Sequence, residues 1–344
     1  MKPFNSKSGS ILIISLWIMA ILSLLAMGLG FRASLEIRLS RYSLERLKAR
    51  YLANAGAVKA KDILSKDNNP YDNLYQCGVS FGSEENPEIV FGPELNKLGE
   101  GAFSIYYARK KEFELTAEKY YGMMDEERKI NINIEKTAPG NVAEYRKVLG
   151  SLSASLTDDI INAMIDWQDP DSEVTSPGGA EEADYEALER PYRCKNASFE
   201  SVEELLLIKG MTREIYDKIK DNVTAYSDGK VNINTASIEV LGAVIDDESG
   251  SYSALANKVF NTRRGEDGTS GTKDDRFFLN LNDISNKVAL EVNESARLAS
   301  LANYFVFKSN NFVICSHGIS GKTTKDIIWI VERVSGKVKY YHEE

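Results

Sequence analysis

The acidic side chains best placed to form a binding site lie in one loop of the chain, residues 169–184. Asp169, Asp171 and Glu173 alternate along it, so a turning loop can aim their carboxylates at one point. Glycines at positions 178 and 179 permit tight backbone paths that would bring carbonyl oxygens to the same point. Hard oxygen ligands in such numbers suit Ca²⁺, which takes about 6–8 oxygens at about 2.3–2.6 Å. The loop is therefore a candidate for a structural calcium site, whose candidate ligands are Asp169, Asp171, Glu173, Glu181 and Asp184.

A second stretch, residues 265–275, has the same ingredients with acids at both ends, although Lys273 could compete with a cation there. Its candidate ligands are Asp267, Thr269, Asp274 and Asp275. The first loop is not an EF-hand, because Val174 stands where that motif needs glycine and Ala180 where it needs a bidentate acid. For both stretches the alternative is a solvated acidic turn, which is the commoner meaning of a cluster of acids.

Other chemistry has little support in the sequence. The two histidines, His317 at the end of an expected strand and His342 near the C-terminus, are not placed for general base work. No glycine-rich phosphate loop, nucleophile elbow or paired metal-ligand motif occurs, so we do not expect an enzyme. The net charge of -9 argues against nucleic-acid binding, which depends on clustered Lys and Arg.

The three cysteines, Cys77, Cys194 and Cys315, are far apart in the sequence and form no CxxC motif. Because their number is odd, at most one disulfide can form. Three separate thiols and a single bridge, such as Cys77–Cys194, both remain open.

The elements that must position these loops begin with an N-terminal helix. After Lys2 and Lys7, residues 11–31 carry no ionisable side chain, which is long enough to span a bilayer and too long for most secretory signals. Apolar residues continue at helical spacing, which predicts one helix as far as about Leu64 with an apolar stripe on its outer half. Arginines after the span leave its orientation open, because both flanks are positive; they are Arg32, Arg38, Arg41 and Arg46.

The body of the chain alternates between two kinds of pattern. Period-2 alternation, typical of half-buried antiparallel strands, occurs at residues 103–107, 112–115 and 130–134 and again at 304–307, 312–315 and 327–331. Helical sequence with capping residues lies between these groups. We therefore predict an α+β fold, in which one antiparallel sheet is interrupted by a large helical insertion.

The N-terminus resembles the prepilin-type signal of pilins and pseudopilins, with a short basic leader ending at Gly9 and an apolar helix starting at Ser10. That resemblance implies cleavage between Gly9 and Ser10 by a prepilin peptidase, followed by methylation. Most such subunits carry glutamate five residues into the mature chain, whereas this chain has Ile14. The K-type minor pseudopilins of type II secretion systems show the same departure. Further stretches similar to that branch are residues 165–185, 190–210 and 231–236.

The resemblance implies a pilin-like sheet domain and a non-enzymatic subunit at the tip of a periplasmic pseudopilus. Implied partners are the I- and J-type minor pseudopilins, the prepilin peptidase and the inner-membrane assembly platform, and calcium is the implied cofactor. The chain would cross the bacterial inner membrane once, with its C-terminal domain in the periplasm. The expected domains are the leader 1–9, the helix 10–64, the sheet domain 65–138 with 303–344, and the helical insertion 139–302.

A different function is suggested by residues 205–219, which resemble a helix-hairpin-helix of DNA-uptake proteins. In that motif the backbone amides of a Gly-x-Gly turn meet a phosphate. Here Thr212 replaces the second glycine, and acids such as Glu203 and Glu214 surround the turn. A packing module is therefore the favoured interpretation. The alternative is a membrane-tethered DNA-binding protein of a competence or type IV pilus system.

Overall fold

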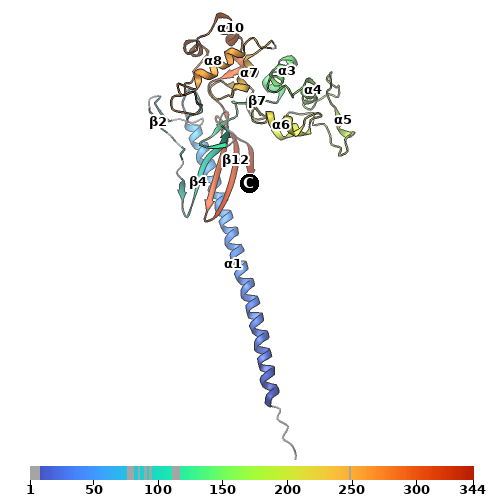
Figure 1. Ribbon diagram of the computed structural model, residues 1–344, viewed down its shortest axis with the longest axis vertical. Helices are drawn as coiled ribbons and strands as arrows, with labels where there is room; N and C mark the ends of the chain where they lie inside the picture. Colours follow the sequence, from blue (N-terminus) through green and yellow to red (C-terminus); the bar gives the residue numbers. More distant parts are fainter. Residues whose placement is uncertain are drawn as a thin grey trace, which may run out of the picture.

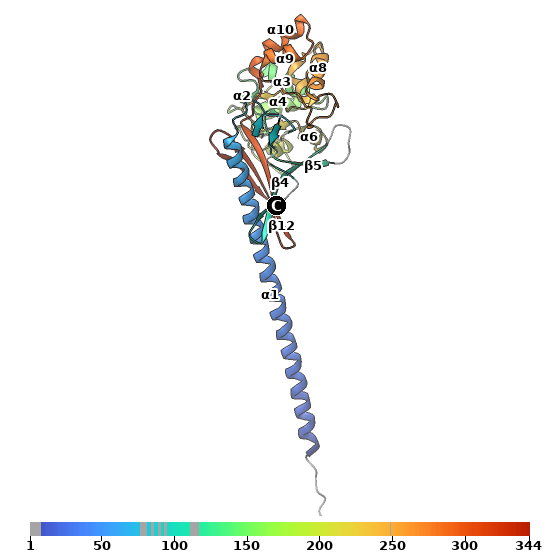
Figure 2. The ribbon, with the colours of Figure 1, turned by 90° about the vertical axis from the view of Figure 1, so that its left-hand side faces the viewer.

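A single helix, α1 (Ser8–Lys66), forms the stem of the molecule (Figures 1 and 2). The computed structural model describes residues 8–75, 81–83, 86–88, 91–92, 95–110, 117–247 and 249–344. The 59 residues of α1 extend about 90 Å at ~1.5 Å per residue. Side chains from Ile11 to Leu44 are all exposed, and the most apolar 18-residue window has a mean hydropathy of 2.6. The predicted long N-terminal helix is confirmed, and its length and composition suffice to cross a membrane.

The second half of α1 packs on an antiparallel sheet whose long strands come from two distant parts of the chain. β4 (Gly101–Lys110) pairs with β11 (Asn311–Ser320), which pairs in turn with β12 (Thr323–Glu332). The order across the sheet is β13-β12-β11-β4-β3. The remaining strands before the insertion or at the edges are β1 (Phe81–Ser83), β2 (Asn86–Glu88), β3 (Asn96–Leu98), β5 (Ala117–Tyr121), β6 (Met124–Asp125) and β13 (Val338–Glu343).

Small residues let α1 approach the sheet closely. Its alanines at positions 49, 53, 57 and 60 are fully buried against the strands. A Cβ atom added at Gly318 of β11 would lie 2.0 Å from the carbonyl oxygen of Ala49 and 2.5 Å from the amide nitrogen of Ala53. Backbone therefore meets backbone here, and the sheet holds the stem at a defined position.

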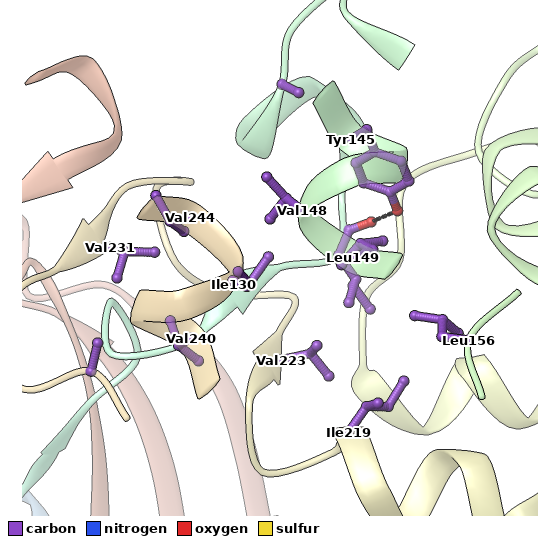
Figure 3. Close-up of a cluster of buried hydrophobic side chains, with 14 of the residues drawn as sticks. Ile130, Tyr145, Val148, Leu149, Leu156, Ile219, Val223, Val231, Val240 and Val244 are labelled. Carbon is purple, nitrogen blue, oxygen red and sulfur yellow. Dashed lines mark hydrogen bonds between the residues drawn. The ribbon is translucent and has the colours of Figure 1, made fainter. Parts of the chain in front are cut away.

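The helical insertion lies between β6 and β11, at the end of the molecule opposite the free end of α1 (Figures 1 and 2). It has its own hydrophobic core, in which Tyr145, Leu149 and Ile130 are fully buried or nearly so (Figure 3). The Tyr145 hydroxyl donates a hydrogen bond to the carbonyl of Ile132. The helices are α2 (Ile134–Thr137), α3 (Val142–Gly150), α4 (Asp158–Asp166), α5 (Glu182–Glu186), η1 (Val202–Leu207), α6 (Arg213–Ile219), α7 (Ile238–Ile245), α8 (Ser253–Arg263), α9 (Leu281–Lys287), α10 (Val292–Ser300) and η2 (Ala302–Tyr304).

The α+β fold with an interrupted sheet is confirmed, but two expected strands of that sheet are wrong. Residues 130–134 and 304–307 were expected to join it. Instead β7 (Ile130–Asn131) pairs in parallel with β8 (Val223–Thr224), and β10 (Phe305–Val306) pairs in parallel with β9 (Val231–Asn232). Asn131 and Asn133 are as buried as Ile130 and Ile132, so the alternation reflects hydrogen-bonded asparagines and not a solvent-facing side. The expected strand at 112–115 lies outside the described residues.

The insertion consists of two copies of one structural unit, which the sequence analysis did not recognise. In the first copy the side-chain oxygen of Asn133 accepts a hydrogen bond from the Phe199 amide at 2.7 Å, and its nitrogen donates to the Phe199 carbonyl at 3.2 Å. In the second, Asn234 makes the same pair of bonds to Phe278 at 2.8 and 2.9 Å. Each buried asparagine ends an apolar-Asn-apolar-Asn run in the sequence.

The order of elements repeats along with these hydrogen bonds. Both units share a short strand, a pair of helices (α3 and α4, or α7 and α8), an acidic loop, a buried phenylalanine, a short capped helix, a second helix and a closing strand. The first unit has α2 and α5 in addition, and the second has η2. The buried residues Leu205 in η1 and Ile284 in α9 hold equivalent positions. The two predicted calcium loops, which follow α4 and α8, therefore occupy equivalent places in the two units.

Candidate cation site

The first acidic loop brings three predicted ligands together. One carboxylate oxygen from each of Asp169, Asp171 and Glu181 lies within 4.8 Å of the others. Asp169 and Asp171 follow the end of α4, whereas Glu181 immediately precedes α5. Glu181 is buried, Asp169 is half-buried and Asp171 is exposed, so the group opens to solvent on one side. This arrangement leaves room for waters to complete the coordination of a bound ion.

Several oxygens of this group lack a well-formed hydrogen bond. Oδ1 of Asp169 and both Oε atoms of Glu181 are buried and accept no well-formed hydrogen bond within the described residues, although the first amides of α5 lie near the Glu181 carboxylate. Burial, followed by the charges of Asp166, Asp169 and Asp171, raises the pKa of Glu181 to about 7. Burial, followed by the charge of Asp171, raises the pKa of Asp169 to about 6. Buried carboxylates without donors are costly, and a divalent cation would satisfy them, so the residues fit calcium.

Asp166, which the sequence analysis missed, organises the loop from within. Its buried carboxylate accepts hydrogen bonds from the Thr175 amide at 3.1 Å and the Ala180 amide at 2.7 Å. A Cβ atom at Gly179 would lie 2.2 Å from Oδ2 of Asp166, so this close contact requires glycine. The signal available in the sequence was an acid at the end of the apolar run of α4, directly before Trp167.

Glu173 and Asp184 lie apart from the three clustered acids. Glu173 is exposed, and its amide donates to Oδ1 of Asp171 at 2.8 Å. Asp184 is in the first turn of α5, where it accepts hydrogen bonds from Lys209 Nζ at 2.7 Å and from the Glu181 amide at 3.2 Å. Its ion pair with Lys209 lowers the pKa of Asp184. Asp184 thus helps to position Glu181, and the full ligand set stays a prediction.

The second acidic loop is held by its own backbone. Oδ2 of Asp274 accepts hydrogen bonds from the amides of Glu266 at 2.6 Å and Asp267 at 3.0 Å, and these bonds lower the pKa of Asp274 to about 2. Oδ2 of Asp275 accepts from the Gly271 amide at 2.7 Å. The amide of Thr269 donates to Oδ1 of Asp267 at 2.7 Å. Since these carboxylates already have donors, this loop fits a cation less well than the first one.

The segment that resembles a helix-hairpin-helix, residues 205–219, packs its two helices into the core of the insertion. Gly210, at φ +82°, turns the chain between η1 and α6. The Thr212 hydroxyl accepts a hydrogen bond from the Ile215 amide at 3.2 Å, so it caps α6. Leu205 and Ile219 from the two helices are buried in the core of the insertion.

Only two of the cysteines fall within the described residues. Cys194 and Cys315 are both free thiols. Burial raises the pKa of each to about 11, which makes them poor nucleophiles. Cys77, and with it the Cys77–Cys194 alternative, lies outside the described residues.

Comparisons with known proteins agree with this architecture. The family model of type II secretion system protein K matches residues 125–228, which correspond to the first unit of the insertion. The chain is 28% identical over 294 residues to type II secretion system protein K of Pseudomonas aeruginosa, covering 82% of this chain and 79% of the relative. It is 26% identical over 243 residues to the protein K of Aeromonas hydrophila, covering 68% and 69%.

The fold is similar to a chain in the crystal structure of the GspK-GspI-GspJ complex from the type 2 secretion system of enterotoxigenic Escherichia coli. The TM-score is 0.63 at 17% identity, and the match covers 89% of this chain and 99% of the other. The sequence similarity to the protein K relatives and the fold similarity to the solved chain thus both extend over most of this chain. The chain is therefore similar to protein K of type II secretion systems, by the family model over its first inserted unit and by the two relatives over most of its length.

Proposed function

We propose that this protein is the tip subunit of a type II secretion pseudopilus, a non-enzymatic component that initiates assembly. The proposal rests on the combination of an exposed apolar stem with a bulky head, which consists of the sheet and the helical insertion. The exposed apolar side chains of α1, such as Leu35 and Leu39, need lipid or other helices to cover them. The stem would meet the helices of other pseudopilins in the filament core.

The placement of the helical insertion favours the tip over the shaft. It lies beyond the end of the sheet, opposite the free end of α1, so a further subunit stacked above would meet it (Figure 2). Ile14 supports the same position. A glutamate there would pair with the amine of a neighbouring subunit, and an unpaired carboxylate in lipid is expensive. A first subunit lacks one of these neighbours and gains nothing from the acid.

Processing and partners follow from this role. The prepilin peptidase would cut between Gly9 and Ser10, leaving α1 on the mature chain as a single-pass anchor with the head in the periplasm. The I- and J-type minor pseudopilins would form the tip complex with it, and the assembly platform would receive that complex. The neighbouring solved structure, a GspK-GspI-GspJ complex, supports these partners.

Calcium would have a structural role in this subunit. An ion held by Asp169, Asp171 and Glu181 would neutralise three carboxylates that repel one another. It would thereby fix the long loop between α4 and α5 against the helices of the first unit.

A three-subunit assembly experiment tests the tip function. Mature protein co-expressed with the I- and J-type minor pseudopilins of the same system is expected to purify as a complex of all three. Leu39→Glu with Leu47→Glu, which places charges on the exposed stripe of α1, should prevent assembly. Val334→Glu is the matched control, because Val334 is 87% exposed in the turn between β12 and β13, and it should assemble normally.

The same preparation distinguishes the alternative of DNA uptake. Retention of duplex DNA by the purified protein is expected to stay at background at physiological ionic strength, because the chain carries a net charge of -9. Tight, salt-dependent retention of DNA together with no three-subunit complex would contradict the tip function and favour the uptake protein.

A further inference from the structure

The first three arginines that follow the apolar span of α1 have no role in the function proposed above. Arg32 adjoins Phe31, the last residue of the uncharged run, and Arg38 and Arg41 lie within the next three turns. All three side chains are exposed. Steps of six and three residues distribute them around the helix instead of along one face. We call these three residues the arginine collar.

The collar differs from the basic residues farther along the same helix. Lys48 pairs with Glu100 at 2.8 Å, Arg50 pairs with Glu343 at 2.8 Å, and Lys59 donates to Asn96 at 2.6 Å. These three side chains are thus committed to the sheet domain. By contrast, no collar residue forms an ion pair with any acid in the part of the chain that the structure describes.

The two acids near the collar do not neutralise it. Glu36 and Glu45 follow Arg32 and Arg41 by four residues, which is the less favourable order for an ion pair on a helix. Neither forms an ion pair with the collar in the structure. The collar therefore presents three guanidinium groups to whatever surrounds the stem.

The position of the collar matches the headgroup layer of a bilayer. At about 1.5 Å per residue, Arg32 lies ~1.5 Å and Arg38 ~10 Å beyond Phe31, and the headgroup layer is roughly 5–8 Å thick. Side chains on a helix tilt toward its N-terminus, so these arginines point back toward the membrane surface. Arg41, ~15 Å beyond Phe31, lies about one Debye length above the headgroups, where the surface potential still acts.

We propose that the arginine collar binds the phosphates of anionic phospholipids in the leaflet on the side of the head. Guanidinium groups suit this ligand, because their planar fork of donors matches phosphate oxygens. The remainder of the chain opposes the collar in charge. Residues 51–344 carry a net charge of -15, so an anionic surface repels the head while it attracts the collar. Lipid binding would thus hold the neck at a fixed depth with the head raised above the membrane.

Native mass spectrometry of the full-length protein in detergent tests this proposal. With equal amounts of phosphatidylglycerol and phosphatidylcholine added, the wild type is expected to retain mainly phosphatidylglycerol. Each arginine near an anionic surface contributes roughly a fivefold preference. The variant Arg32→Gln, Arg38→Gln, Arg41→Gln should therefore lower the ratio of retained phosphatidylglycerol to phosphatidylcholine by about tenfold or more.

The matched control removes the same number of positive charges elsewhere on α1. The variant Lys48→Gln, Arg50→Gln, Lys59→Gln should keep the wild-type lipid ratio, because its side chains face the sheet domain. An unchanged ratio in the collar variant would overturn the proposal. So would an equal fall in both variants. Because the assay uses one purified subunit, its outcome is independent of whether the protein forms a pseudopilus tip.

Discussion

Calcium is expected to raise the melting temperature of the purified protein by roughly 5–10 °C when present at about one hundred times its dissociation constant. That concentration corresponds to about 2.7 kcal/mol of added stability, and a domain of this size gains roughly 2–4 °C per kcal/mol. The reason lies in Asp169 and Glu181, whose buried oxygens accept no well-formed hydrogen bond within the described residues. Thermal unfolding followed by circular dichroism, with calcium or with excess chelator, measures the shift.

Substitutions in the two acidic loops assign the effect to one of them. The double variant Asp169→Asn, Glu181→Gln removes two of the three clustered carboxylates and should abolish the response to calcium. The double variant Asp274→Asn, Asp275→Asn provides the matched control in the equivalent loop of the second unit. It should retain the response, although it loses hydrogen bonds and melts lower at every calcium concentration. A response lost in the second variant and kept in the first would assign the ion to the second loop.

The same site predicts how pH affects the calcium-free protein. The pKa of Glu181 is raised to about 7 from 4.5, and that of Asp169 to about 6 from 3.8. Between about pH 4 and 7 the folded state thus binds more protons at these groups than the unfolded state, and their contribution to stability falls as the pH rises. Bound calcium requires the ionised carboxylates, so calcium should stabilise the protein more at pH 8 than at pH 5.

Replacing Arg333 with methionine is expected to cost about 3–5 kcal/mol in the free energy of unfolding. Nη2 of Arg333 lies 2.6 Å from Oδ1 of Asp72 and 3.2 Å from Oδ2 of Asp67, and all three side chains are buried. The variant would leave two buried acids without their cation. Burial already raises the pKa of Asp72 to about 7, against the opposing charge of Arg333. Urea unfolding of the two proteins measures the difference.

This ion pair holds the head to the stem, so its loss affects more than one element. Asp67 follows the last residue of α1, and the Asp72 side chain also accepts a hydrogen bond from the Ser309 amide at 2.5 Å. Arg333 itself comes directly after β12. The double variant Asp72→Asn, Arg333→Met removes a buried charge of each sign and should be less destabilised than Arg333→Met alone. Equal losses in the single and double variants would show that packing, and not charge, dominates.

The stem and the long C-terminal strands follow from hydrophobic pattern alone. An uncharged run of 21 residues, 11–31, can only be a lipid or core helix, and period-2 alternation at 312–315 and 327–331 marks half-buried strands. The bridges β7–β8 and β9–β10 could not be found in this way. Their asparagines alternate with apolar residues because they bond to backbone over separations such as the 66 residues from Asn133 to Phe199. Such partners are invisible to any local pattern.

The acidic loop was predictable, whereas its geometry was not. The spacing suggested that Asp169, Asp171 and Glu173 converge, with Glu181 as a further candidate ligand, whereas the structure brings together Asp169, Asp171 and Glu181. Glu173 and Asp184 have the same chemistry but different environments, since one is exposed and the other pairs with Lys209. Asp166 escaped notice because it lies within a helical run, and only the folded loop presents the Thr175 and Ala180 amides to it.

The intact mass of the mature protein, made with and without a prepilin peptidase, shows whether the chain is processed as a pseudopilin. A pseudopilin must enter the filament through its N-terminal helix after losing its leader. We predict that co-expression with the peptidase yields a chain beginning at Ser10, shorter by the nine residues Met1 to Gly9 and carrying one added methyl group. Without the peptidase the leader should remain. A chain that still begins at Met1 under both conditions would contradict its assignment as a pseudopilus subunit.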